Sequence, residues 1–235
     1  MDSARPVLRG VSGVADRNSF VSASKAPVWR RSLEIDEHIV FKPYDVSQFN
    51  SLPDFELASK TRARILRQAQ LCGQVLCRYG CQQMLAASLL HKHFDLAPNE
   101  RLVRMYDDRK RAHAVPMTTE TAADALPCIW RFCDGASGPG WYPVEYVQAL
   151  PAGRGLYTVL QRCEHVFGEL AQVLLQNKIE SVFGVAALYA DEGFLIGDHE
   201  QTVESSNANL RRLDLNVSPR DLCERDATVT LYRWR

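Results

Sequence analysis

Two histidines separated by one residue, His91 and His93, are the residues of this sequence whose type and spacing could do chemistry. Side chains alternate along an extended strand, so residues i and i+2 share a face. Two imidazoles placed side by side can reach one metal ion. The sequence therefore predicts a candidate metal or catalytic site at this pair. The alternative is a structural role, in which both imidazoles hydrogen-bond to neighbours at a strand end.

A metal ion held by this pair needs at least one further ligand. Glu100 lies on the same predicted hairpin and completes the candidate site of His91, His93 and Glu100. His113 and His199 are alternative ligands, but their distance from the pair cannot be read from the sequence. Apart from this candidate metal, the cofactor is unknown.

Nucleophilic catalysis needs a thiol or hydroxyl beside a base, and no motif here supplies both. Cys81 with His91, and Cys163 with His165, are candidates only because they are close along the chain. The seven cysteines are an odd number without the dense spacing of a disulfide scaffold, which favours a reducing compartment. None has the C-x2-C spacing typical of structural zinc, so we expect mostly buried thiols.

Two strands joined by a turn are expected to position the histidine pair. An apolar run leads into His91, residues 97–100 contain the Pro and Asn typical of a turn, and residues 101–106 resume an extended pattern. The sequence thus predicts a β-hairpin between residues 89–96 and 101–106. A helix over residues 82–94 is the alternative, because Gln, Met, Leu and Ala are good helix formers.

Two apolar stripes with helical spacing predict amphipathic helices over residues 54–78 and 156–176. Gly80 is well placed to end the first helix as a left-handed cap. The opposite face of that helix carries a basic cluster, which we interpret as solvated, with anion binding as the alternative. The first stripe consists of Ala58, Ile65, Ala69, Cys72 and Leu76, and the second of Leu156, Leu160, Cys163, Phe167, Leu170 and Leu174.

Further strands are predicted at residues 128–133, 141–147, 182–189, 194–196, 210–215 and 227–234. The glycine-rich loop at residues 134–140 has neither P-loop nor nucleophile-elbow spacing, so we expect a turn rather than a ligand loop.

The first helix and its following strand coincide in pattern with the second helix and strand when the chain is shifted by 98 residues. This shared order indicates two pseudo-repeated helix-strand-strand units, or chance. Because hairpins dominate over crossover units, the expected fold class is α+β, with two long helices packed on one face of a mainly antiparallel sheet.

Residues 1–33 read as a flexible tail, with a transit peptide as the alternative, and residues 34–235 as a single globular α+β domain. Lys plus Arg equals Asp plus Glu at 28 each, which gives no hint of nucleic acid or anionic membrane as a partner. No apolar run approaches the roughly 20 residues of a membrane span. We expect a soluble, cytoplasmic protein.

The expected function is binding of a small ligand or protein partner, or self-association as a homo-oligomer. Helix stripes and aromatic residues could supply an apolar groove or an interface core. A metal- or histidine-dependent enzyme that uses His91 and His93 is the alternative. The aromatic residues in question are Trp130, Trp141, Tyr142 and Trp234.

Overall fold

The structure, a computed structural model, describes residues 41–106, 112–148, 154–188, 201–207, 211–215 and 228–232. The predicted tail and its boundary, the strand expected at residues 194–196 and the alternative ligand His199 lie outside these ranges. No helix within the described ranges is long and apolar enough to cross a membrane.

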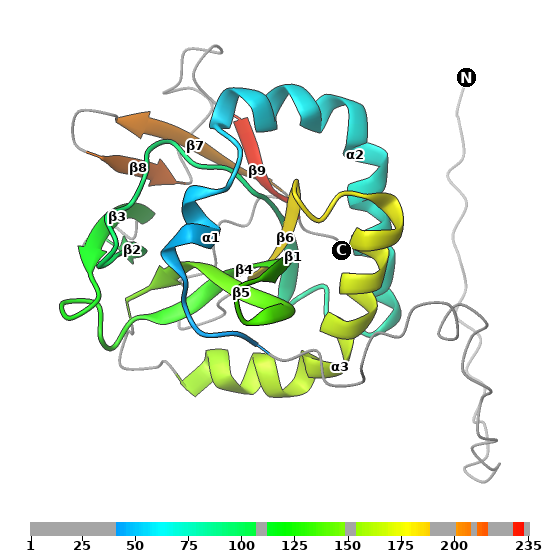
Figure 1. The fold of residues 1–235 in the computed structure, drawn as a ribbon. Coiled ribbons are helices and arrows are strands. Elements are labelled where there is room, and N and C mark those ends of the chain that lie inside the picture. Colours follow the sequence, from blue (N-terminus) through cyan, green and yellow to red (C-terminus); the bar gives the residue numbers. More distant parts are fainter. Residues whose placement is uncertain are drawn as a thin grey trace, which may run out of the picture. The chain divides into compact units, whose positions relative to one another are not determined.

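Helices and strands alternate in groups along the described chain, so the content is mixed (Figure 1). The elements are α1 Val46–Asn50, α2 Phe55–Arg78, β1 Leu85–Leu89, β2 Glu100–Tyr106, β3 Ala112–Thr118, β4 Leu126–Gly135, β5 Gly138–Val147, α3 Arg154–Asn177, β6 Phe183–Ala187, β7 Gln201–Asn207, β8 Arg212–Leu215 and β9 Thr228–Tyr232.

Nine strands in the described ranges form one closed barrel in the order β1-β6-β4-β5-β2-β3-β8-β7-β9, and β9 pairs back onto β1. Neighbouring strands are antiparallel except β2 and β5, which are parallel. A parallel pair is required here. Each antiparallel pair reverses the strand direction, so nine antiparallel pairs in a ring of nine strands would bring the first strand back with the opposite direction. The barrel is therefore a mixed sheet.

The predicted fold class, two long helices packed on one face of a mainly antiparallel sheet, is wrong. The sheet curls into a closed mixed barrel and has no flat layer on which helices lie. The predicted hairpin is also wrong: β1 pairs with β6 and β9, whereas β2 pairs with β3 and β5. A turn does form at residues 97–100, but it carries the chain to another side of the barrel. Local alternation specifies which residues are extended and not which strands pair.

Strand β1 is buried on both faces, which explains its lack of polar alternation. Leu85 and Leu89 face a cluster formed with α2 and α3, here called the outer core, whereas Ala86 points into the barrel. The outer core includes Ala69, Cys72, Leu76, Trp130, Trp141, Cys163, Phe167, Leu170, Leu174 and Phe183. The cluster inside the barrel, here called the barrel core, includes Phe49, Leu52, Ala86, Leu90, Leu102, Ala114, Cys128, Val144, Val147, Ala186 and Leu213.

Helices α2 and α3 occupy the two ranges whose apolar stripes predict helices. Both end in a Schellman motif, and the motifs are 98 residues apart. Gly80 is left-handed after α2, with φ of 67°, as predicted, and Lys178 is left-handed after α3, with φ of 54°. The equivalent hydrogen bonds are Cys81 N to Leu76 O and Gly80 N to Cys77 O, then Ile179 N to Leu174 O and Lys178 N to Leu175 O.

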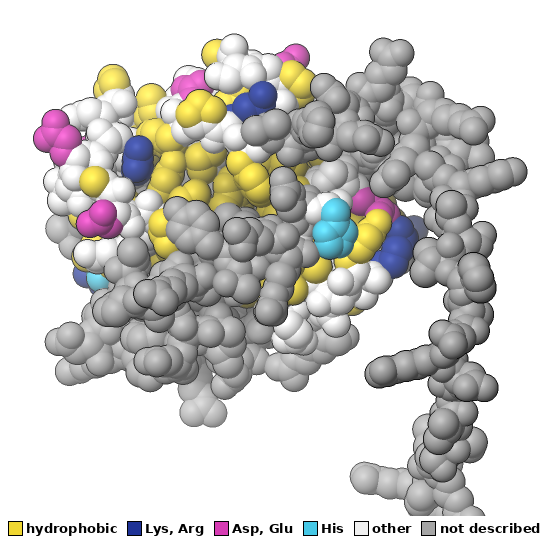
Figure 2. Space-filling view, turned by 90° about the horizontal axis from the view of Figure 1, so that it is seen from below, with side chains coloured by type: hydrophobic (Ala, Val, Ile, Leu, Met, Phe, Trp, Pro, Cys, Tyr) yellow, Lys and Arg dark blue, Asp and Glu magenta, His cyan; other side chains and the backbone are white. Residues whose placement is uncertain are grey.

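Hydrophobic side chains gather in the middle of one face of the molecule, with charged side chains around them (Figure 2). Strand β9 is paired on both sides, with β1 and β7. An unpaired strand edge at β9 therefore cannot drive self-association.

Candidate functional site

The predicted histidines lie side by side just after β1, with ring centroids 5.0 Å apart and planes at 84°. The strand ends at Leu89, but the backbone stays extended because Lys92 forms a parallel bridge with Asp54. Alternation therefore continues beyond the strand and separates His91 and His93 from the Lys92 side chain between them.

The histidine pair packs against Phe55, the first residue of α2. The Phe55 ring centroid lies 5.2 Å from that of His91 and 4.5 Å from that of His93. The Nδ1 atom of His91 lies 3.0 Å from the Leu89 carbonyl oxygen. When Nδ1 carries the proton it donates to this carbonyl, and Nε2 is then the acceptor or ligand atom.

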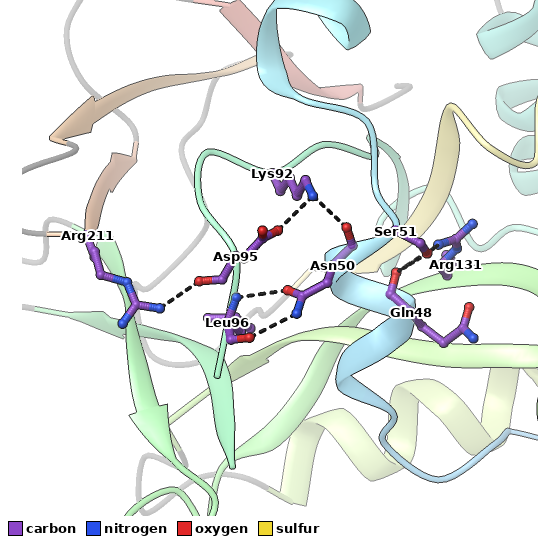
Figure 3. A network of polar contacts seen from close by, with 8 residues as sticks. All are labelled: Gln48, Asn50, Ser51, Lys92, Asp95, Leu96, Arg131 and Arg211. Atoms are coloured by element: carbon purple, nitrogen blue, oxygen red, sulfur yellow. Dashed lines mark hydrogen bonds and ion pairs between the residues drawn. The ribbon is translucent and has the colours of Figure 1, made fainter. Parts of the chain in front are cut away.

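The loop that carries the histidines is fastened to α1 (Figure 3). The Asn50 side chain donates from Nδ2 to the Leu96 carbonyl at 2.9 Å and accepts from the Leu96 amide at 2.8 Å. Lys92 Nζ donates to the Asn50 carbonyl at 2.5 Å and to the Asp95 carboxylate at 2.7 Å. These bonds fix the backbone on both sides of His93.

Glu100 fastens the other end of the same loop. Its carboxylate accepts from Arg211 at 2.7 Å and 3.1 Å and from the Ala97 amide at 2.8 Å. The hydrogen bond from Arg211 is the largest cause that lowers the pKa of Glu100. Arg211 also donates to the Asp95 carbonyl at 2.7 Å. The hydrogen bonds of Glu100 thus anchor the loop and are not made to either histidine.

The structure brings together two of the three predicted site residues, His91 and His93. Within the described residues, no group of three or more His, Cys, Asp or Glu side chains is arranged to hold a metal ion. The alternative ligand His113 lies on β3, opposite Met105 of β2.

The thiol and histidine candidates of the sequence have other neighbours. The sulfur of Cys163 lies 3.1 Å from that of Cys81, and the His165 ring packs against Tyr79 at 5.1 Å. Burial raises the pKa of the Cys72 thiol to about 12. Such a thiol is protonated and inert at neutral pH.

A second polar site, which the sequence analysis missed, lies inside the barrel. Arg104 is opposite Ala114 on β3 and beside Val147 on β5, and both of these belong to the barrel core. Directly paired residues on neighbouring strands point to the same face, so Arg104 points inward. Its Nε and Nη2 atoms lie 2.8 Å and 2.6 Å from Oε1 of Glu145 on β5. The two side chains are only 6% and 10% exposed.

The charges of this pair act on a neighbouring thiol. Burial raises the pKa of Cys128, Glu145 raises it further, and Arg104 lowers it. Cys128 therefore stays protonated and is not a nucleophile. One signal in the sequence could have revealed the pair: Arg104 follows Leu102 at i+2 and so shares a face with an apolar residue of the same strand.

No protein family, curated protein or solved structure matches this chain.

Proposed function

We propose that the protein binds a small ligand inside the barrel, beside Arg104 and Glu145. The observation that carries this proposal is an ion pair that is almost fully removed from water among apolar side chains. Removing two charges from water costs several kcal/mol per ion, and apolar residues of similar volume are often equally stable in such places. Interaction with a polar ligand group gives a reason for charged groups at this position.

The side chains around the pair favour a ligand of small size. Ala114 lies directly opposite Arg104, and Ala86 and Ala186 also belong to the barrel core. Barrel diameter grows with strand number, and eight strands already enclose enough space for side chains or one small ligand. A molecule with an apolar body and one primary amide group fits this chemistry, because its carbonyl oxygen can accept from Arg104 and its NH₂ group can donate to Glu145.

A thermal-shift screen tests the proposal with fragments that each carry an aromatic ring and a primary amide. A fragment at ten times its Kd stabilises the folded protein by about 1.4 kcal/mol, or about 3–6 °C in Tm. The matched control is the double variant Arg104→Met/Glu145→Leu, which replaces both charges together and is expected to fold. The proposal fails if no fragment shifts the unmodified protein, or if the control is shifted equally.

We also propose that the protein works in a reducing intracellular compartment, with the cytoplasm as the expected one. The six cysteines in the described ranges are free thiols. Disulfides are rare in such compartments, so a freshly purified protein should show no disulfide in a thiol assay under denaturing conditions. A disulfide in protein purified under thiol-blocking conditions would contradict this assignment.

We further propose that the protein self-associates and that its chain contains an internal pseudo-repeat. Two large hydrophobic side chains that are exposed in the described ranges, Leu57 of α2 and Tyr79 directly after it, support an interface with a second copy or another protein. The equivalent helix ends 98 residues apart support a pseudo-repeat. Light scattering over a range of concentrations tests self-association, and a strict monomer throughout would remove it.

A metal site at His91 and His93 is the second candidate function, in which these residues would serve as ligands of a metalloenzyme or metal-binding protein. The contact between His91 Nδ1 and the Leu89 carbonyl favours it, because metal-binding histidines usually donate their other ring N–H to such a group. The fastened loop adds to this, since binding sites need ligands held by their surroundings. Further ligands would come from water or from residues outside the described ranges.

Metal analysis separates the metal role of the pair from the structural one. Protein purified without a histidine tag or chelator should carry near-stoichiometric transition metal, and His91→Ala or His93→Ala should lose it. The matched control is His165→Ala, because His165 is exposed and packs against Tyr79. Absence of metal in the unmodified protein, together with no shift of Tm on adding Zn²⁺, would overturn this role.

A further inference from the structure

Two buried thiols from different parts of the chain touch each other. The sulfur atoms of Cys81 and Cys163 lie 3.1 Å apart. Cys81 follows the left-handed cap of α2, whereas Cys163 lies on the buried face of α3. Their exposed fractions are 2% and 0%. A disulfide needs sulfurs about 2.05 Å apart, so a shift of about 1 Å would bring them to bonding distance.

We propose that Cys81 and Cys163 form a reversible disulfide that joins the end of α2 to α3. Hydrogen peroxide is the oxidant class that fits, because it is small enough to reach buried thiols during brief local opening. One thiol reacts with peroxide to give a sulfenic acid and one water. The second thiol then attacks the sulfenic sulfur, which forms the S–S bond and releases a second water. The thiol pair loses two electrons and two protons, and peroxide is reduced by two electrons.

The bond would connect covalently two helices that otherwise meet by packing and through the ion pair between Arg78 of α2 and Glu169 of α3. It closes a loop between residues 82 positions apart in the sequence. Closing a long loop restricts the unfolded chain, so the oxidised form is expected to be more stable than the reduced form. In a reducing compartment the resting state is the dithiol, and the disulfide forms only when peroxide rises.

Cysteine 77 provides a matched control on the same helix. Cys77 is exposed, whereas Cys81 is buried, and the two are four residues apart. A reaction governed by exposure alone would modify Cys77 first, because accessible thiols oxidise more readily than buried ones. If the contact between the two buried sulfur atoms decides the outcome instead, the disulfide forms between Cys81 and Cys163.

The test treats the full-length protein with hydrogen peroxide, blocks remaining thiols with iodoacetamide after unfolding, and maps disulfides by mass spectrometry. We expect one intramolecular bond between Cys81 and Cys163, reversal by dithiothreitol, and a rise in Tm of about 5 °C or more. Cys77→Ser should behave as the unmodified protein. Cys81→Ala and Cys163→Ala, which keep a small apolar side chain, should lose both the bond and the rise in Tm.

Two results would overturn the inference. One is that Cys81 and Cys163 are still alkylated after peroxide has oxidised Cys77. The other is a disulfide that maps to different cysteines or joins two copies of the chain. If either alanine variant fails to fold, the disulfide map of the Cys77→Ser variant alone decides between the outcomes.

Discussion

Gly184→Ala should be strongly destabilising, because the backbone of a neighbouring strand occupies the space that a methyl group needs. Gly184 lies on β6, beside β4 in the barrel. A Cβ atom there would lie 2.3 Å from the Trp130 carbonyl oxygen and 2.8 Å from Cδ2 of Leu90. Distances below 3.0 Å are essentially absent for real Cβ atoms, so β4 and β6 would have to separate by about 1 Å.

The magnitude follows from what would have to move. The Trp130 side chain packs against Phe41 and Phe167, with ring centroids 5.8 Å and 6.0 Å away, so a shift of its backbone disturbs the outer core. Overpacking usually costs about 1–3 kcal/mol. We place Gly184→Ala at about 3 kcal/mol, because the obstructing atom belongs to the backbone. For a domain of this size, Tm should fall by about 6–12 °C.

Gly168→Ala is the matched control, because it adds the same methyl group within α3 where no heavy atom other than the helix's own nearby backbone lies within 4 Å. It should stabilise the protein by about 0.5–1 kcal/mol, since alanine is the better helix former. Urea unfolding followed by tryptophan fluorescence measures both changes, because Trp130 and Trp141 are buried. A Gly184→Ala variant within about 0.5 kcal/mol of the unmodified protein would refute the close approach of β4 and β6.

Three further predictions concern the helix caps, the buried ion pair and the fastened loop. Lys178→Gly should stabilise the protein by about 1 kcal/mol in urea unfolding, because its φ of 54° strains any residue with a Cβ, and Gly80→Ala should destabilise it by a similar amount. A Lys178→Gly variant that is destabilised would contradict the left-handed cap. Arg104→Met alone should cost about 3–5 kcal/mol, whereas Arg104→Met/Glu145→Leu should be nearly neutral, and equal losses in both would show that the pair is not buried. Arg211→Gln should cost about 0.5–1 kcal/mol near neutral pH. The pKa of Glu100 is lowered in the folded state, so this contribution is present above the unfolded pKa of about 4.3 and is lost as pH falls through the folded value. A loss that persists unchanged at low pH in pH-dependent unfolding would exclude the Glu100 partner.

The sequence by itself determined the features that depend on neighbours within a few residues. Apolar stripes with helical period located α2 and α3, because burial of one helix face repeats every three to four residues. Gly80 marked the end of α2 because glycine adopts positive φ without strain. Strands β4 and β5 were predictable on either side of a glycine-rich turn. Alternation along the chain also placed His91 and His93 together.

Only the tertiary structure decided which strands pair, and with that the fold class and the second site. The partners of β1 are β6 and β9, and those strands lie roughly a hundred residues or more away along the chain. Arg104 and Glu145 are 41 residues apart and meet because β2 and β5 pair in parallel. In the same way, Glu100 accepts hydrogen bonds from Arg211, which directly precedes β8, and not from the histidines. Alternation encodes the face on which a side chain lies, but strand partners are chosen by burial summed over the whole barrel, and no local pattern contains that sum.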